Sequence, residues 1–233
     1  MLLARRRRVH EVLLATDLDP SELVTDIVEL AAEQRVPVRE ISRTELDAQA
    51  RTDALQGLVA RAAPLPEAEL ADLGRAGRHG AAPFLVVLDG VTDPGNLGAL
   101  LRSAEAAGAS GVVLPRHRAV HVTPTVTKAA AGAVEHLPMA VVGGLPAALG
   151  RLRQLGVWLV VLDGAADERL FDLELATEAV ALVLGAEGRG LSPLVRTRCD
   201  SIVAVPIRGR VASLNVAAAG ALACFEVARR RAD

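Results

Sequence analysis

Arg102, Asn96 and Asn215 are polar side chains set into otherwise apolar segments, and each needs a partner or a chemical role. Arg102 follows Asn96 by six residues, on an expected helix that is rich in leucine and alanine. A guanidinium there either points into a cleft or lies on the solvent side of the helix. The sequence leaves both interpretations open. In a cleft, arginine makes forked, planar contacts with phosphate.

A glycine-rich loop, Leu184-Gly185-Ala186-Glu187-Gly188-Arg189-Gly190, follows an apolar run. Its three glycines allow the backbone to approach a ligand closely. The spacing matches neither the dinucleotide fingerprint nor a Walker A loop. Because such loops are common after strands, this loop alone indicates only a candidate binding site.

A third loop runs from Val205 and Pro206 through Ile207, Arg208 and Arg210 to Ser213, Leu214 and Asn215. Ser213 could simply cap the alanine-rich helix that follows. Asn215 is less easily explained, because asparagine is a poor helix former and its neighbours are apolar. In the loop that starts at Asp89, Pro94 and Gly95 predict a turn and Asn96 a helix cap.

The elements that must position these loops alternate between strand and helix from residue 84 onward. The strands are continuous apolar runs, which suit a parallel sheet covered on both faces. Ligands collect at the carboxyl ends of such strands. The predicted strands are Phe84–Asp89, Gly111–Leu114, Val157–Asp163, Ala179–Leu184 and Ile202–Val205. The predicted helices are Asn96–Ala107, Thr125–Ala133, Pro146–Leu155, Pro193–Arg198 and Leu214–Arg231.

Residues 1–61 predict a separate small α/β domain of order β-α-β-α-β. Asp19 is the expected N-cap of its first helix, which runs to about Gln34, and Ser42 with Glu45 forms a capping box for the second. The expected strands are Val9–Ala15, Pro37–Ile41 and Gln56–Ala60. Residues 62–82 contain several prolines and glycines and predict a linker with a short helix around Glu67–Leu73. Residues 83–233 form the second predicted domain.

Composition limits the class of protein. Hydrophobic residues make up 51% of the 233 residues and aromatic residues 2%, so valine, leucine and alanine must build the core. A net charge of −2 argues against a general nucleic-acid binder. Cys199 and Cys224 lack metal-ligand spacing and are expected to be buried free thiols. With neither a secretory segment nor an apolar run of about 20 residues, we expect a cytoplasmic protein with no metal and no membrane span.

In this order and spacing, the three loops resemble the motifs of the SpoU (TrmH-like) family of the SPOUT superfamily. These motifs are Asn-Leu-Gly-Ala with Arg102, then Gly-Ala-Glu-Gly-x-Gly-Leu, then Ser-Leu-Asn-Val after Pro206. The resemblance covers residues 84–231. The first domain is similar to the substrate-binding domain of the bacterial ribosomal RNA members, although Leu55 replaces the usual histidine before Gln56-Gly57 and the segment before the first strand is short.

The resemblance implies a deep trefoil knot in the C-terminal domain and transfer of a methyl group from S-adenosylmethionine to an RNA ribose 2′-hydroxyl. It implies cofactor contacts at Leu184, Gly185, Val205, Ile207, Ser213 and Leu214. It assigns the chemistry to Arg102, with Asn96 holding it, Ser213 and Asn215 shaping the target pocket and Glu187 in a structural role. Because a guanidinium stays protonated, we expect Arg102 to bind phosphate and polarise the hydroxyl rather than act as a literal base.

The family resemblance also implies a homodimer, and the alanine-rich last helix is compatible with a dimer interface or with core packing. Ribosomal RNA, at a guanosine, is the expected substrate. Transfer RNA, the ribosomal site of thiazole-antibiotic resistance and a non-catalytic RNA-binding assembly factor are alternatives, and Ala217, where relatives often have serine, favours the last of these. The candidate phosphate contacts are Arg5 to Arg8, Arg116, Arg118, Lys128, Arg208 and Arg210.

Overall fold

The computed structural model describes residues 1–50, 56–117, 119–186, 188 and 190–232. Contacts between residues divide the chain into two compact units, Met1–Pro66 and Glu67–Asp233. Each unit has its own sheet and its own buried core. The two units are therefore described separately below.

The first unit is a three-stranded sheet of order β2-β1-β3 with one helix on each face, as the sequence predicts. Its strands are β1 (Val9–Ala15), β2 (Val38–Ile41) and β3 (Leu58–Ala62). Its helices are α1 (Glu22–Glu33) and α2 (Arg43–Gln49). β2 runs parallel to β1, and β3 runs antiparallel to it.

Two local predictions for this unit are wrong. Ser21, not Asp19, caps α1, because its extended backbone lets its hydroxyl accept the N–H of Val24 at 3.3 Å. The third strand begins at Leu58 rather than Gln56, because Gly57 has a φ of +80° and cannot belong to a strand. The capping box of Ser42 and Glu45 is confirmed.

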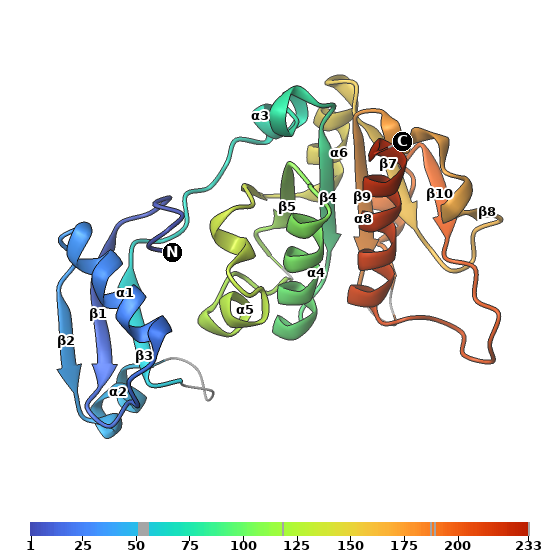
Figure 1. Cartoon of the computed structure of the whole chain (residues 1–233). Helices are drawn as coiled ribbons and strands as arrows, with labels where there is room; N and C mark the ends of the chain where they lie inside the picture. The colour runs from blue at the N-terminus through green and yellow to red at the C-terminus, as the bar shows by residue number, and fades with distance from the viewer. Residues whose placement is uncertain (51–55, 118, 187, 189, 233) are drawn as a thin grey trace. The chain divides into compact units, whose positions relative to one another are not determined.

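The second unit contains a seven-stranded sheet of order β6-β5-β4-β9-β7-β10-β8 (Figure 1). Every pairing recorded between its strands is parallel, which confirms the sequence prediction. The strands are β4 (Phe84–Asp89), β5 (Gly111–Pro115), β6 (Met139–Val142), β7 (Trp158–Leu162), β8 (Glu168–Arg169), β9 (Val180–Gly185) and β10 (Ser201–Ala204). The short strands β6 and β8 were not predicted, since neither presents a long apolar run.

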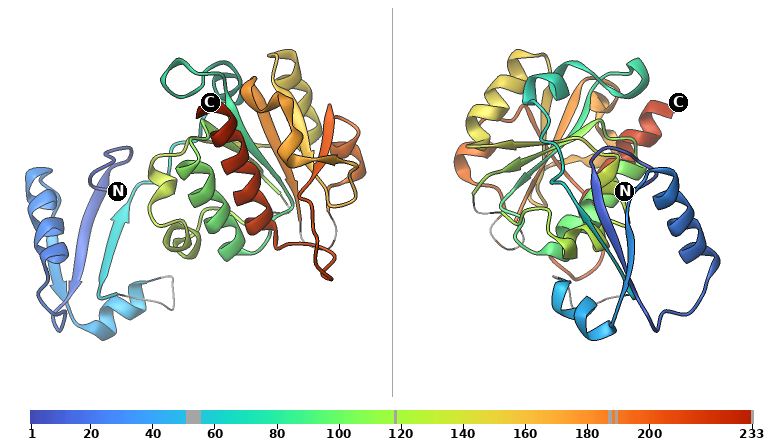
Figure 2. Two further views of the ribbon diagram at one scale, coloured as in Figure 1. Left: turned by 45° about the vertical axis from the view of Figure 1, so that its right-hand side comes forward. Right: turned by 90° about the vertical axis from the view of Figure 1, so that its left-hand side faces the viewer.

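Helices cover both faces of this sheet (Figures 1 and 2). On one face, α4 (Pro94–Ala106) packs against α5 (Pro124–Ala129) and α8 (Val216–Ala232). On the other, α6 (Leu145–Gln154) packs against α3 (Leu70–Arg75) and α7 (Pro193–Arg196). α5 ends four residues before its predicted end and a 3-10 turn, Ala133–Glu135, follows it. Further 3-10 turns span Arg78–Gly80, Leu170–Asp172 and Glu174–Thr177.

The predicted linker, residues 62–82, divides at the boundary between the units. Ala62 is the last residue of β3, in the first unit. Glu67 forms a parallel bridge with Met139, and the buried Leu73 of α3 belongs to the core beneath the second sheet. The part of this segment after Pro66 therefore packs as structure of the second unit.

Gly220 allows α8 to lie directly on α4 and the sheet. A Cβ atom at this position would lie 2.3 Å from Leu100 Cδ2 and 2.9 Å from Leu184 Cδ1. The close approach fixes the start of α8 beside the carboxyl end of β9. Within the described part of the chain, no helix has both the length and the apolar character needed to cross a membrane.

Candidate active site

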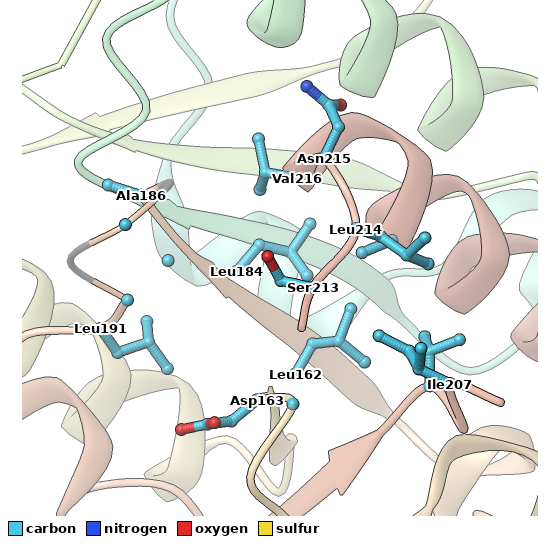
Figure 3. A pocket seen from close by; sticks show the side chains of 16 residues that line it. Leu162, Asp163, Leu184, Ala186, Leu191, Ile207, Ser213, Leu214, Asn215 and Val216 are labelled. Atoms are coloured by element: carbon cyan, nitrogen blue, oxygen red, sulfur yellow. The ribbon is translucent and has the colours of Figure 1, made fainter. Parts of the chain in front are cut away.

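A cavity of about 520 Å³ opens at the carboxyl edge of the second sheet (Figure 3). Four segments line it: the ends of β7 and β9 with the residues after each, the segment after β10 and the start of α8. The lining residues are Leu162, Asp163, Gly164, Leu184, Gly185, Ala186, Gly188, Gly190, Leu191, Val205, Ile207, Ser213, Leu214, Asn215, Val216 and Ala219.

All six residues predicted from the sequence to contact a cofactor line this one cavity. They come from the end of β9 (Leu184 and Gly185), from the segment after β10 (Val205 and Ile207) and from the residues before α8 (Ser213 and Leu214). The sheet order explains their convergence, because β9 lies beside β7 and β7 beside β10. What the cavity binds is considered below, as a proposal.

The glycine loop, defined here by its described residues 186, 188, 190 and 191 after β9, turns back on itself. The N–H of Gly190 donates to the carbonyl oxygen of Ala186 at 2.9 Å, and Gly188 and Gly190 have φ values of +75° and +63°. A Cβ atom at Gly185 would lie 2.4 Å from the carbonyl carbon of Gly190. Glycine at 185 is thus required by the loop itself, a reason that its spacing alone did not reveal.

Two carboxylates hold the segment that follows this loop. The side chain of Asp89, at the end of β4, accepts the N–H of Ser192 at 2.9 Å. The side chain of Asp163, just after β7, pairs with Arg196 of α7 and also accepts the N–H of Ala165 at 2.9 Å. Asp163 was not among the predicted site residues. Its signal was available, since it ends an apolar strand in the same way as Asp89.

Asn215 connects two of the predicted motifs. Its Nδ2 donates to Asn96 Oδ1 at 2.9 Å, and its Oδ1 accepts the N–H of Ala217 at 2.8 Å. Asn215 therefore caps α8, which begins at Val216 rather than at the predicted Leu214. The alternative that Ser213 is the cap is wrong.

The start of α4 also differs from the prediction. Asp93, not Asn96, is its N-cap, because the Asp93 carboxylate accepts the N–H of Asn96 at 2.7 Å. The side chain of Asn96 is thereby left to face Asn215. No hydrogen bond from Asn96 to Arg102 exists among the described residues.

Arg102 lies on the exposed side of α4, while its neighbours Leu100 and Leu101 are buried. Within the described residues it has no ion pair or hydrogen bond, and it does not line the cavity. Of the two interpretations that the sequence left open, the structure of the single chain agrees with the exposed one. Glu187 and Arg118, both named as candidates, lie outside the described residues.

The two cysteines are free, and burial raises the pKa of the Cys199 thiol to about 11 and that of Cys224 to about 12. Thiols with such values are poor nucleophiles near neutral pH. No group of three or more His, Cys, Asp or Glu side chains suited to a metal ion occurs in the described parts of the chain.

Comparison with known proteins identifies the family of the chain. The model of the SpoU rRNA Methylase family matches residues 83–225, and a model for RNA 2′-O ribose methyltransferase substrate binding matches residues 1–68. The chain belongs to the SpoU rRNA methylase family, as the sequence motifs indicated.

Individual relatives extend over nearly the whole chain. The chain is 40% identical over 228 residues to the 23S rRNA (guanosine-2′-O-)-methyltransferase RlmB of Pseudomonas putida, covering 97% of this chain and 90% of that protein. Its identity to RlmB of Pseudomonas aeruginosa is 42% over 229 residues, covering 97% and 90%. The SpoU methyltransferase AviRb from Streptomyces viridochromogenes, solved in complex with AdoMet, matches with a TM-score of 0.81 and 26% identity, covering 99% of this chain and 86% of that one.

Proposed function

We propose that this protein is an S-adenosylmethionine-dependent RNA methyltransferase that methylates the ribose 2′-hydroxyl of a guanosine in ribosomal RNA. The observation that carries the proposal is the single cavity in which the second and third family motifs meet. Two relatives, each matched over more than 200 residues, are named as 23S rRNA guanosine-2′-O-methyltransferases. The match of residues 1–68 to a substrate-binding model supports assigning RNA binding to the first unit.

The cavity suits S-adenosylmethionine in size and chemistry. Its volume lies within the range of about 300–1,000 Å³ that is usual for small-molecule sites. Leu184, Ile207 and Leu214 offer apolar surface to a purine ring, and the glycine loop offers backbone hydrogen-bonding groups. Asp163 is the one charged side chain among the described lining residues, and its carboxylate is already paired with Arg196. The cofactor, when bound, supplies a methyl group on a positively charged sulfur.

We propose that Arg102 activates the nucleophile, the ribose 2′-hydroxyl. A 2′-hydroxyl is a weak nucleophile and must be polarised or relieved of its proton. The Arg102 guanidinium is exposed and has no partner among the described residues, so its donors are available to an RNA phosphate. Held in this way, it would orient and polarise the hydroxyl. Ser213 and Asn215 would shape the target pocket, and Glu187 would have a structural role.

We infer that the C-terminal segment forms the deep trefoil knot implied by the family. β10 lies beyond β7 in the sheet, whereas α8 packs back on α4 and on Leu184 of β9. The chain between β10 and α8 must therefore return across the carboxyl edge, past the glycine loop. A crystal structure in which no part of residues 180–220 passes through a loop formed by the rest of the chain would refute the knot.

We further propose that the protein is a homodimer, with α8 in the interface. Leu222 and Phe225 are 42% and 51% exposed on this helix, one turn apart, which is unusual for apolar side chains of this size. A Phe225→Glu variant should sediment as a monomer if this face is the interface, whereas Leu23→Glu, on the exposed face of α1, should not change the mass. We place the protein in the cytoplasm, where its RNA substrate and reduced cysteines would be found.

The decisive experiment supplies the purified chain with methyl-labelled S-adenosylmethionine and separate samples of ribosomal and transfer RNA that lack the modification. Labelled methyl on a ribosomal guanosine 2′-oxygen is the expected result. Label on transfer RNA would select that alternative substrate. Cofactor binding with no transfer to any RNA would leave the non-catalytic assembly factor, for which Ala217 is the motivating residue.

An Arg102→Ala variant tests the catalytic assignment within the same experiment. We expect methyl transfer to fall by about 10²- to 10³-fold, the usual cost of removing one donor that stabilises developing charge. RNA binding should be retained, since one phosphate contact is only part of the total. Unchanged transfer by this variant would contradict the role of Arg102.

A further inference from the structure

The glycine loop lines the cavity through Ala186, Gly188, Gly190 and Leu191, and of these Leu191 packs against the core of the second unit. Its internal bond, from the Gly190 N–H to the Ala186 carbonyl, closes the loop. Its polar anchors lie at the residues that follow, Ser192 and Arg196.

Both anchors are carboxylates at the ends of neighbouring strands. β9, which leads into the loop, lies between β4 and β7 in the sheet. Asp89 ends β4 and accepts the N–H of Ser192 at 2.9 Å. Asp163 follows β7 and pairs with Arg196, one turn further along the chain. The segment that leaves the loop is thus tied to the strands on both sides of the strand that enters it.

The two ties differ in their relation to the cavity. Asp163 itself lines the cavity, and in Figure 3 it lies on the same side as Leu191 and opposite Ile207. Asp89 does not line it and is paired in register with Gly185, the residue that leads into the loop. Gly90, next in sequence, would place a Cβ atom only 3.5 Å from that of Ala186, which brings this end of β4 against the loop as well.

We propose that Asp89 and Asp163 are positioning residues for the cofactor, holding the glycine loop in the conformation that forms one wall of its pocket. This role rests on the proposed function. Neither residue takes part in the methyl transfer. Their effect is on cofactor affinity, because a loop that must be ordered by the ligand binds it more weakly than one already in place.

Conservative and non-conservative variants separate positioning from folding. Asp89→Ala removes the acceptor for the Ser192 N–H, whereas Asp89→Asn keeps an acceptor oxygen there. Asp163→Ala removes the ion pair with Arg196. Asp172→Ala is a matched control, because Asp172 is an exposed carboxylate paired with Arg169 and does not line the cavity.

The measurements are made on the full chain: calorimetric binding of S-adenosylmethionine, steady-state constants with RNA, and amide hydrogen exchange without cofactor. For Asp89→Ala and Asp163→Ala we expect the cofactor Kd and KM to rise about tenfold, the effect of one hydrogen bond to a charged group, with kcat nearly unchanged. Asp89→Asn should restore most of the affinity, and Asp172→Ala should match the parent protein. Exchange at Ser192 and Gly190 should accelerate in Asp89→Ala.

The outcomes distinguish this role from the proposed function. If the parent protein bound no S-adenosylmethionine, the proposed function and the positioning role would both fail. If the parent bound it and the double variant Asp89→Ala/Asp163→Ala bound it equally well, only the positioning role would fail. The positioning role would also fail if Asp89→Ala bound the cofactor more weakly while amide exchange in the loop stayed slow, thermal stability fell by a matching amount and Asp89→Asn gave no rescue. The weaker binding would then come from a general loss of folding.

Discussion

The Asn215 side chain donates from Nδ2 to Asn96 Oδ1 at 2.9 Å and thereby joins the start of α8 to the start of α4. The same Asn215 side chain caps α8 by accepting the N–H of Ala217 at 2.8 Å. One amide therefore has two separate duties, one for its nitrogen and one for its oxygen. Asparagine is the residue that can perform both at once, since a carboxylate has no donor and a serine hydroxyl is shorter.

Asn215→Asp separates these two duties. The aspartate retains an acceptor for the helix cap but faces the acceptor oxygen of Asn96 without a donor. We expect nearly unchanged thermal stability and a clear loss of methyl transfer, because the pocket between α4 and α8 loses its fixed geometry. Asn215→Ala, which removes the cap as well, should also lose about 1 kcal/mol of stability.

Chemical denaturation and methyl-transfer rates measured on both variants provide the check. Full activity in Asn215→Asp would show that the contact with Asn96 is dispensable. A loss of stability in Asn215→Asp as large as that in Asn215→Ala would show that the cap had not been preserved.

The contact between Asn215 and Asn96 also marks how far the sequence could predict this site. The six residues that the motifs assigned to the cofactor all line one cavity, because each lies at or after the end of an apolar strand or before the last helix; they are Leu184, Gly185, Val205, Ile207, Ser213 and Leu214. Local spacing does not reveal which side chains meet across 119 residues of chain. The family resemblance assigned Asn96 to Arg102, and nothing in the sequence indicated its contact with Asn215.

The fold, like the site, could be predicted from the sequence only in part. Phe84–Asp89 was predicted to the residue, and the other apolar strands predicted in the second unit are correct to within one residue at each end. β6 was missed because its four residues, Met139–Val142, follow a proline and have only a short apolar signal. β8 has no apolar residue at all, since it consists of Glu168 and Arg169 held by pairing with β10. Such strands depend on tertiary neighbours that no local pattern specifies.

Arg231, near the end of α8, is predicted to be a major stabilising residue of the second unit. Its guanidinium lies 5.4 Å from the centre of the Phe84 ring and donates to four backbone carbonyl groups. These are the carbonyls of Ala82, Pro83, Ala176 and Glu178. Arg231→Ala would leave several partly buried carbonyl oxygens without donors and should cost about 2–4 kcal/mol.

Arg231→Lys tests the geometric part of this prediction. A single ammonium group cannot span carbonyls that a planar guanidinium reaches from several sides, so most of the loss should remain. Arg198→Ala, at an exposed position, is the control and should stay within about 0.5 kcal/mol of the parent protein. The free energy of unfolding in urea is the measurement, and an Arg231→Ala value close to that of Arg198→Ala would refute the assignment.

The buried thiols predict how stability depends on alkaline pH. Burial raises the pKa of Cys224 from 9.0 to about 12, because its side chain is fully enclosed and its thiolate would be poorly solvated. Between these values the unfolded chain has lost a proton that the folded chain retains, so ionisation favours unfolding as the pH rises. Below pH 9 the Cys224 thiol is protonated in both the folded and the unfolded chain, so it should contribute nothing to the pH dependence of stability.

We therefore expect the free energy of unfolding to fall by on the order of 1 kcal/mol per pH unit above pH 9 through this group. Unfolding in urea at pH 8, 9 and 10 measures the slope, and Cys224→Ala should reduce it to the part that Cys199 contributes, even though the variant begins from a lower stability. An unchanged slope in Cys224→Ala would mean that other groups cause the alkaline loss.

Two glycines in helices should respond in opposite directions to the same substitution. Gly220 of α8 has Leu100 Cδ2 2.3 Å and Leu184 Cδ1 2.9 Å from the position of an added Cβ atom, whereas nothing lies within 4 Å of that position at Gly150 of α6. Gly220→Ala must push α8 away from α4 and β9, which should cost about 1–3 kcal/mol. Gly150→Ala should instead gain about 0.5–1 kcal/mol, because alanine favours the helix and meets no neighbour.

The displacement of α8 should also reach the site. Leu184 lines the cavity, and Asn215 precedes α8, so Gly220→Ala is expected to weaken both cofactor binding and the contact with Asn96. Thermal unfolding and calorimetric binding of S-adenosylmethionine on the two variants measure both effects. Equal stability of the two variants would contradict the tight packing of α8, and unaltered binding in a destabilised Gly220→Ala would show that the pocket does not depend on it.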